Sequence, residues 1–142
     1  MENAFLSVRD LDVDGKKVFL RLDLNVPIKG GVIRDDSRIR ASLPTIAHLL
    51  EGGAAVVACS HLGRPRGEVI PDLSLAPVAK RLQELLPTRD VLFAADAAGP
   101  DAASKASQLK PGQVLLLENV RFDPGETKDD PGLARKLRAL AD

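Results

Sequence analysis

The stretch Ala54-Ala-Val-Val-Ala-Cys-Ser-His-Leu-Gly-Arg-Pro65 decides the fold class of this chain. It begins as a short apolar run rich in small and β-branched residues, which is typical of a buried strand, and it stops abruptly at polar residues. In an open α/β sheet, ligands bind in the crevice outside the carboxyl ends of parallel strands. His61 and Arg64, on either side of Gly63, therefore follow the strand at a position that suits the binding of an anion.

The same arrangement occurs twice more along the chain. Asp23 and Asn25 lie at the end of a first apolar strand, and Asn119 and Arg121 follow the apolar run Val114-Leu-Leu-Leu117. Because the carboxyl ends of parallel strands lie at the same edge of a sheet, these polar groups are expected to lie near one another. The pattern predicts one shared site for a small, negatively charged molecule.

Strand and helix patterns alternate along the chain, which predicts βαβ units and a parallel sheet. The near-continuous apolar run of the last strand indicates burial on both faces. We therefore expect an α/β fold: a three-layer, Rossmann-like parallel sheet with helices on both faces, incomplete and with about four main strands. The expected strands span residues 18–24, 54–60, 91–95 and 114–117, with a small hairpin over 26–34. The expected helices span 42–51 with Ser42 as cap, 74–86 with Ser74 as cap, an Ala-rich segment to about 109, and a last helix from Pro131 after the loop 123–130.

Composition excludes several classes of function. The 142 residues suffice for one domain with a real core, and 20 basic side chains balance 20 acidic ones. Nonspecific binding to nucleic acid or to a membrane surface needs a basic excess, and the chain has no Trp or Tyr for base stacking. A single cysteine excludes an intrachain disulfide, and neither a membrane span nor a signal peptide is evident. We expect a cytoplasmic protein with no nucleic-acid or membrane partner.

Arginine supplies the chemistry that an anion site requires. Its planar fork of donors matches carboxylate and phosphate oxygens, and each charge-assisted hydrogen bond contributes about 1.5–3 kcal/mol. Arg38, Arg64 and Arg121 are the candidate anion ligands, whereas Asp23 and Asn25 suit substrate hydroxyl groups. This mixture predicts a phosphorylated hydroxy acid as ligand. The chain has no GxxxxGK loop, no GxGxxG after a strand and no metal-ligand spacing, so we expect no nucleotide or metal site in it.

Each candidate also has a purely structural explanation. An arginine is usually a solvated surface group, Asp23 and Asn25 are good loop formers, and His61 can be a structural hydrogen-bonding residue.

Five motifs, in this order, resemble the phosphoglycerate kinase family from about Leu11 to the end of the chain. They are Arg21-Leu-Asp-Leu-Asn-Val-Pro27, Asp36-Ser-Arg-Ile-Arg-Ala-Ser-Leu-Pro-Thr-Ile46, Ser60-His-Leu-Gly-Arg-Pro65, Ser74-Leu-Ala-Pro-Val78 and Leu117-Glu-Asn-Val-Arg-Phe122. The resemblance implies a glycolytic transferase that interconverts 1,3-bisphosphoglycerate plus ADP with 3-phosphoglycerate plus ATP. The family has two Rossmann-like domains: the amino-terminal one holds the glycerate, and the other holds ATP or ADP with Mg²⁺.

The resemblance also assigns roles to individual residues. Asp23 and Asn25 would contact the hydroxyl and carboxyl region of the glycerate. Arg38 would bind the carboxyl end and, as the catalytic residue, balance charge on the phosphoryl group in transfer. The distal phosphate would be held by His61, Arg64, Arg121 and the backbone near Gly63.

The resemblance further implies that residues 1–142 form an amino-terminal glycerate-binding domain, truncated before its last strands, with the nucleotide-binding domain absent from this chain. We expect the chain alone to be inactive. The family's strand order, 3-4-2-1-5-6, would leave the first strand at an open edge. The isolated fragment is therefore expected to self-associate or to be marginally stable, whereas a full-length family member is expected to be a monomer. Two alternatives remain at this point: a free-standing module that binds a phosphometabolite, and a structural or assembly unit whose basic residues are incidental.

Overall fold

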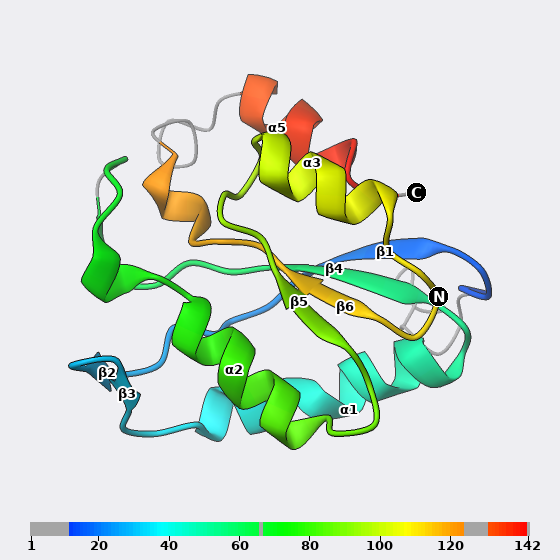
Figure 1. The fold of residues 1–142 in the computed structure, drawn as a ribbon, viewed down its shortest axis with the longest axis horizontal. Helices are drawn as coiled ribbons and strands as arrows, with labels where there is room; N and C mark the ends of the chain where they lie inside the picture. The colour runs from blue at the N-terminus through cyan, green and yellow to red at the C-terminus, as the bar shows by residue number, and fades with distance from the viewer. Residues whose placement is uncertain (1–11, 66, 124–130, 142) are drawn as a thin grey trace, which may run out of the picture.

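The computed structural model describes residues 12–65, 67–123 and 131–141, and its centre is a four-stranded parallel sheet (Figure 1). The strands lie in the order β1-β4-β6-β5. This confirms the expected α/β class. Numbered by their sequence order within this sheet, the strands lie in the order 1-2-4-3, which is the 3-4-2-1 part of the family order read from the other end, with β1 at an edge. Whether two copies pair along that edge stays a prediction. The strands are β1 (Lys17–Arg21), β4 (Ala55–Cys59), β5 (Val91–Phe93) and β6 (Val114–Leu116).

Helices cover both faces of the sheet, as predicted (Figure 1). The helices α1 (Ser37–Glu51) and α2 (Ala76–Leu85) pack on one face, and α3 (Pro100–Ser107) and α5 (Pro131–Arg138) lie on the other. Strand β4 is buried along its whole length and alternates between two apolar clusters. Val56 and Ala58 face the α1–α2 side, whereas Val57 and Cys59 face the other side. A strand that is buried on both faces needs the continuous apolar run that the sequence has there.

The first strand is shorter than predicted. The sequence pattern continues to residue 24, but β1 ends at Arg21. The Leu22 N–H still donates to the Cys59 carbonyl of β4 at 2.9 Å, but the next N–H on that side, that of Leu24, donates to the side chain of Ser60, which ends the backbone ladder. The apolar residues beyond β1 therefore belong to a loop over the sheet edge, and this loop carries Asp23 and Asn25.

Helix α1 begins earlier than predicted, at Ser37 instead of Ser42. Ser42 is not the cap: its hydroxyl lies inside the helix and donates to the Ile39 carbonyl. Pro44 also lies within the helix, and the early start is supported by Asp35, whose carboxylate accepts from the Ser37 N–H at 2.8 Å. The correction matters for the site because it places Arg38 in the first turn of α1.

The other boundaries follow the sequence closely. The hairpin is confirmed as β2 (Ile28–Lys29) and β3 (Val32–Ile33), joined by two glycines with positive φ, as a tight hairpin turn requires. Helix α2 begins two residues after Ser74, whose hydroxyl accepts from the Ala76 N–H. Short 3-10 turns precede α2 and follow β6, namely η2 (Pro71–Leu73) and η3 (Val120–Phe122). Most of the predicted loop 123–130 lies outside the described residues. Within the described ranges, no helix has the length and apolarity that a membrane crossing needs.

Candidate functional site

Strands β1, β4 and β6 end at the same edge of the sheet, and the candidate residues follow them. The parallel register pairs Arg21 with Cys59 and Ala58 with Leu116, so the three strands finish side by side. Beyond the strands, the Val120 N–H donates to the Ser60 carbonyl at 3.2 Å. The loops that carry the predicted site residues therefore leave the sheet next to one another, as the strand-end pattern predicts.

Ser60 joins the loop after β1 to the loop after β4. Its side chain is fully buried, and its hydroxyl oxygen accepts from the Leu24 N–H at 2.9 Å. The same hydroxyl donates to the His61 carbonyl at 3.1 Å. Because a buried backbone N–H must find a partner, this contact fixes how the loop with Asp23 and Asn25 crosses the end of β4.

Asn119 joins the loop after β4 to the turn after β6. It is fully buried, and its Oδ1 accepts from the N–H groups of Leu62 and Arg121 at 3.2 and 3.0 Å. Its Nδ2 donates to the carbonyls of Leu62 and Leu73 at 2.7 and 3.0 Å. The sequence pattern placed Asn119 among the polar groups of the strand ends. In the structure, all four hydrogen bonds of its side chain go to the backbone of neighbouring loops. Asn119 therefore holds these loops together, and its side chain is not directed at a ligand.

Gly63 lies at the centre of the predicted residues. Its N–H donates to Asn25 Oδ1 at 3.1 Å, and its carbonyl accepts from Arg121 Nη1 at 3.3 Å. Its φ is +62°, and a Cβ built there would lie 2.8 Å from the Leu73 Cδ2 atom. Only glycine adopts this backbone conformation without strain, and it lets the loop backbone approach both neighbouring side chains.

Arg38 completes the group from the first turn of α1. Its Nη1 donates to the Asn25 carbonyl at 2.7 Å and lies 3.4 Å from Asp23 Oδ1. The Arg38 side chain is 55% exposed, so much of its guanidinium faces solvent. The nearby Asp23 carboxylate offsets part of the positive charge that the sequence predicted here.

Direct contacts thus connect Asp23, Asn25, Arg38, Gly63 and Arg121 into one cluster, which we call the strand-end cluster. Asp23 and Asn25 are bound to each other as well, through the Asn25 N–H and Asp23 Oδ1 at 3.2 Å. The other two predicted residues flank Gly63 in the same loop: His61 is half-buried and Arg64 is exposed. The contacts of the cluster assign no role to either side chain, so their part in binding stays a prediction.

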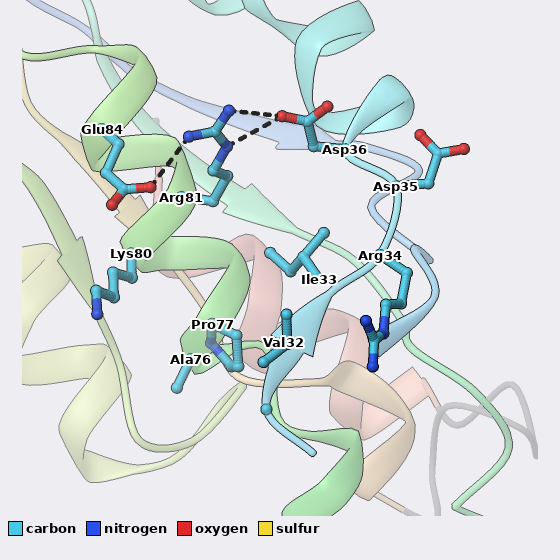
Figure 2. Close-up of a pocket in the computed structure, with 11 residues that line it drawn as sticks. Val32, Ile33, Arg34, Asp35, Asp36, Ala76, Pro77, Lys80, Arg81 and Glu84 are labelled. Carbon is cyan, nitrogen blue, oxygen red and sulfur yellow. Dashed lines mark hydrogen bonds and ion pairs between the residues drawn. The ribbon is translucent and has the colours of Figure 1, made fainter. Parts of the chain in front are cut away.

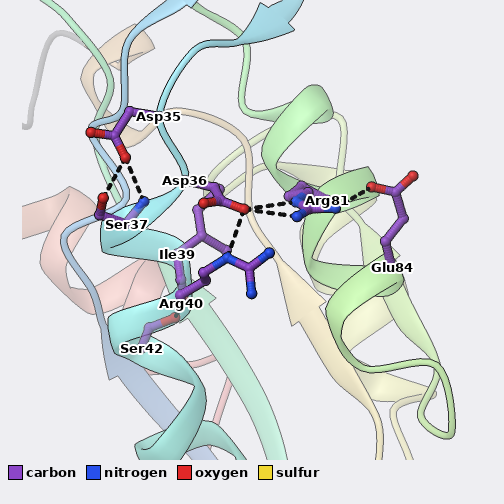
Figure 3. Close-up of polar contacts among 8 residues, drawn as sticks. All are labelled: Asp35, Asp36, Ser37, Ile39, Arg40, Ser42, Arg81 and Glu84. Atoms are coloured by element: carbon purple, nitrogen blue, oxygen red, sulfur yellow. Dashed lines mark hydrogen bonds and ion pairs between the residues drawn. The ribbon is translucent and has the colours of Figure 1, made fainter.

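The start of α1 carries charged groups that the sequence analysis did not single out (Figure 3). Asp36 Oδ2 accepts from Arg81 Nε and Nη2 on α2, at 3.0 and 2.8 Å, and from Arg40 Nε at 3.0 Å. Hydrogen bonds from Arg81 keep the pKa of the Asp36 carboxyl below its ordinary value of 3.8. The Ser37 hydroxyl and N–H likewise lower the pKa of Asp35. Both carboxylates are therefore ionised at neutral pH, beside Arg38.

A pocket of about 780 Å³ opens next to this ion pair, between β3 and α2 (Figure 2). Residues 31–36 line one side of it, and residues of α2 line the other. It does not include the residues of the strand-end cluster. Among the described residues, no group of three or more His, Cys, Asp or Glu side chains is arranged to hold a metal ion.

Comparisons with known proteins agree on one relationship. The family model described as phosphoglycerate kinase matches residues 8–142. Two similar curated relatives, each named phosphoglycerate kinase, come from Moorella thermoacetica, at 52% identity over 98% of this chain, and from Thermosipho africanus, at 53% over 96%. They are matched over only 35% and 34% of their own lengths, so this chain spans about a third of them.

Solved structures give the same result in three dimensions. The structure of phosphoglycerate kinase from Coxiella burnetii matches with a TM-score of 0.82 and 40% identity, over 97% of this chain and 34% of that one. The crystal structure of the enzyme from Pyrococcus horikoshii matches with a TM-score of 0.80 and 37% identity, over 97% of this chain and 35% of that one.

Proposed function

The chain belongs to the phosphoglycerate kinase family, and we propose that it supplies the 3-phosphoglycerate site of that enzyme. The reaction is the reversible transfer of a phosphoryl group between 1,3-bisphosphoglycerate with ADP and 3-phosphoglycerate with ATP. The observation that carries the proposal is the strand-end cluster, in which residues from separate segments meet around Gly63.

The proposed roles follow the two ends of the substrate. Arg38 binds the carboxyl end, where its exposed guanidinium replaces the long contact to Asp23 with a contact to the substrate. It also balances charge on the phosphoryl group in transfer, as the catalytic residue. Asp23 and Asn25 contact the hydroxyl and carboxyl region. The distal phosphate is held by His61, Arg64, Arg121 and the backbone of Gly63.

These residues contribute position and charge without forming covalent bonds to the substrate. Phosphoryl transfer depends mainly on holding the reactants in line and stabilising the charge that spreads over the transferred group. An arginine whose Nη1 is anchored while its side chain is 55% exposed suits this task, since it is already oriented before the substrate arrives.

The nucleotide and its Mg²⁺ are proposed to bind outside this chain, in the second domain that the family resemblance implies. We propose that residues 1–142 are an amino-terminal glycerate-binding domain and are inactive alone. A cytoplasmic location stays a prediction. Turnover by the 142-residue chain in a coupled assay would contradict its proposed inactivity.

Binding measurements on this chain test the assignment of the two ends. Isothermal titration with 3-phosphoglycerate, glycerate and inorganic phosphate would compare the wild type with Arg38→Met and Arg121→Met. Arg38→Met should weaken binding of 3-phosphoglycerate and glycerate about tenfold or more and spare phosphate, because it removes the carboxyl ligand. Arg121→Met should weaken binding of 3-phosphoglycerate and phosphate and spare glycerate.

The exposed residue Arg135 on α5 offers a matched control. Arg135→Met removes the same charge from the same molecule and should leave all three affinities unchanged. No saturable binding of 3-phosphoglycerate at millimolar concentration, or equal losses in all three variants, would overturn the proposed site.

A further inference from the structure

The position of Arg38 depends on where α1 begins. Arg38 is the second residue of the helix and reaches the Asn25 carbonyl at 2.7 Å, a contact that a small shift of the first turn would lengthen. The N-cap of the same helix is Asp36, whose side chain makes no cap hydrogen bond to its own helix. Its carboxylate is instead occupied by arginine side chains.

Those arginines differ in what they connect. Arg40 lies one turn along α1, so its contact with Asp36 stays within one helix. Arg81 lies on α2, forty-five residues away in sequence, and places two N–H groups on the same carboxylate oxygen (Figure 3). Glu84 accepts from Arg81 Nη1 at 3.1 Å and so orients the guanidinium from behind. Of the two arginine contacts, the one with Arg81 ties the start of α1 to another helix.

The ion pair between Asp36 and Arg81 lies at the border of the pocket. Between β3 and α2 the structure has a hollow of about 780 Å³, and Asp36 and Arg81 are among the residues that line it (Figure 2). The Asp36 and Arg81 side chains are 24% and 32% exposed, so both are partly shielded from solvent. Ile39, three residues after Asp36, is fully buried in the same apolar cluster as Val78 and Leu82 of α2. Apolar packing is not directional, so the hydrogen-bonded ion pair adds a contact of fixed geometry at the start of α1.

We propose that Arg81 is a positioning residue for Arg38 and acts through Asp36. By holding the N-cap of α1 against α2, it keeps Arg38 in contact with the Asn25 carbonyl and directed at the carboxyl end of the bound glycerate. The proposal rests on the proposed function for its effect on affinity. It adds a residue outside the strand-end cluster that tunes the site.

The first test compares two charge-neutralising variants that share one partner. Arg81→Met and Arg40→Met each remove a cation from Asp36, but only the first cuts the connection to α2. Arg81→Met should weaken binding of 3-phosphoglycerate and glycerate about fivefold and leave inorganic phosphate unchanged, since it acts on the carboxyl end alone. Arg40→Met should leave all three affinities unchanged. A variant that merely loosened the fold would weaken all three ligands together.

The second test asks whether the effect passes through Arg38. In an Arg38→Met background, adding Arg81→Met should change no affinity further, because the group that it positions is gone. Equal losses in both backgrounds would overturn the proposal. Melting temperatures recorded beside each titration show that the variants are folded at the temperature of measurement.

A readout without ligand separates this proposal from the proposed function. The NMR signal of the Arg38 side-chain Nε–H reports its environment and mobility in the free chain. Arg81→Met should shift and narrow this signal, and Arg40→Met should leave it unchanged. If the wild type binds no 3-phosphoglycerate, the proposed function fails while this readout still tests the positioning. If the wild type binds and Arg81→Met alters neither affinity nor the Arg38 signal, the positioning role alone is refuted.

Discussion

Replacing Asn119 with alanine tests whether a buried amide, more than the exposed arginines, builds the strand-end cluster. Its side chain makes four hydrogen bonds, all to backbone groups of three other residues. Alanine removes all four at once. The chain then loses the side-chain link through Asn119 between the loop that contains Gly63 and the turn that contains Arg121, and keeps the contact from Arg121 Nη1 to the Gly63 carbonyl and the one from the Val120 N–H to the Ser60 carbonyl.

The expected cost follows from which partners stay buried. Leu62 is buried and relies on Asn119 for both its N–H and its carbonyl. Each buried polar group left without a partner costs about 1–3 kcal/mol. The Leu73 carbonyl and the Arg121 N–H are only partly buried, so water can replace much of what they lose. We expect a loss of about 4 kcal/mol, which is a large share of the ordinary stability of a domain, about 5–15 kcal/mol.

Urea unfolding followed by circular dichroism measures this loss. Asn119→Asp keeps the shape but turns the Nδ2 donor into an acceptor that faces two carbonyls, so it should destabilise by a similar amount without making a cavity. Gln108→Ala, an exposed amide at the end of α3, is the control and should change stability by less than about 0.5 kcal/mol. A loss below about 1 kcal/mol for Asn119→Ala, with an unchanged m-value, would refute the argument.

Two further predictions concern neighbouring contacts. Ser60→Ala leaves the buried Leu24 N–H without its partner and should lower stability by about 1–2 kcal/mol in thermal unfolding; a loss under about 0.5 kcal/mol would show that the loop finds another partner. Asp36→Asn should lower the urea midpoint at neutral pH, with a gap to the wild type that narrows as pH falls. The sign follows from the lowered pKa of Asp36: its ionised form stabilises the fold above the ordinary value of 3.8, and that contribution is lost as pH falls through the lower folded value. A gap that stayed constant from about pH 6 to about pH 2 would contradict this assignment.

The sheet and the place of the strand-end cluster were predictable from local sequence. The run that forms β4 is apolar at every position because both of its faces are covered, and this pattern by itself identifies a central strand. Since parallel strands end together, the polar residues behind each apolar run had to approach one another. That reasoning grouped Asp23, Asn25 and Arg121 with His61 and Arg64. The structure confirms that Asn25 and Arg121 both contact Gly63, which lies between His61 and Arg64 in the sequence, whereas a shared role for the His61 and Arg64 side chains stays a prediction.

The direction in which a strand-end side chain points was not predictable from the same pattern. Asn119 and Arg121 follow β6 two residues apart, yet Asn119 is fully buried and Arg121 reaches the Gly63 carbonyl. The turn η3, which begins directly after Asn119, sets this difference, and periodicity carries no signal for it. The start of α1 was misjudged because Ser42, a good capping residue, stands directly before the apolar pattern. The contact from Asp36 to Arg81 was not predictable because it joins residues far apart in sequence.

Two sets of residues with different physical roles make up this site, and their variants should separate stability from affinity. Ser60 and Asn119 are fully buried and bind only backbone, so their loss leaves unpaired groups inside the protein. Arg38 is 55% exposed, and its charge is already solvated in the free chain. Removing an exposed cation therefore changes unfolding by little, because water takes over its interactions. If Arg38 binds the substrate as proposed, the same removal should weaken binding strongly, because a bound carboxylate is deprived of its counter-charge. Arg38→Met should thus lower the binding free energy and leave the unfolding free energy nearly unchanged. Asn119→Ala should lower both.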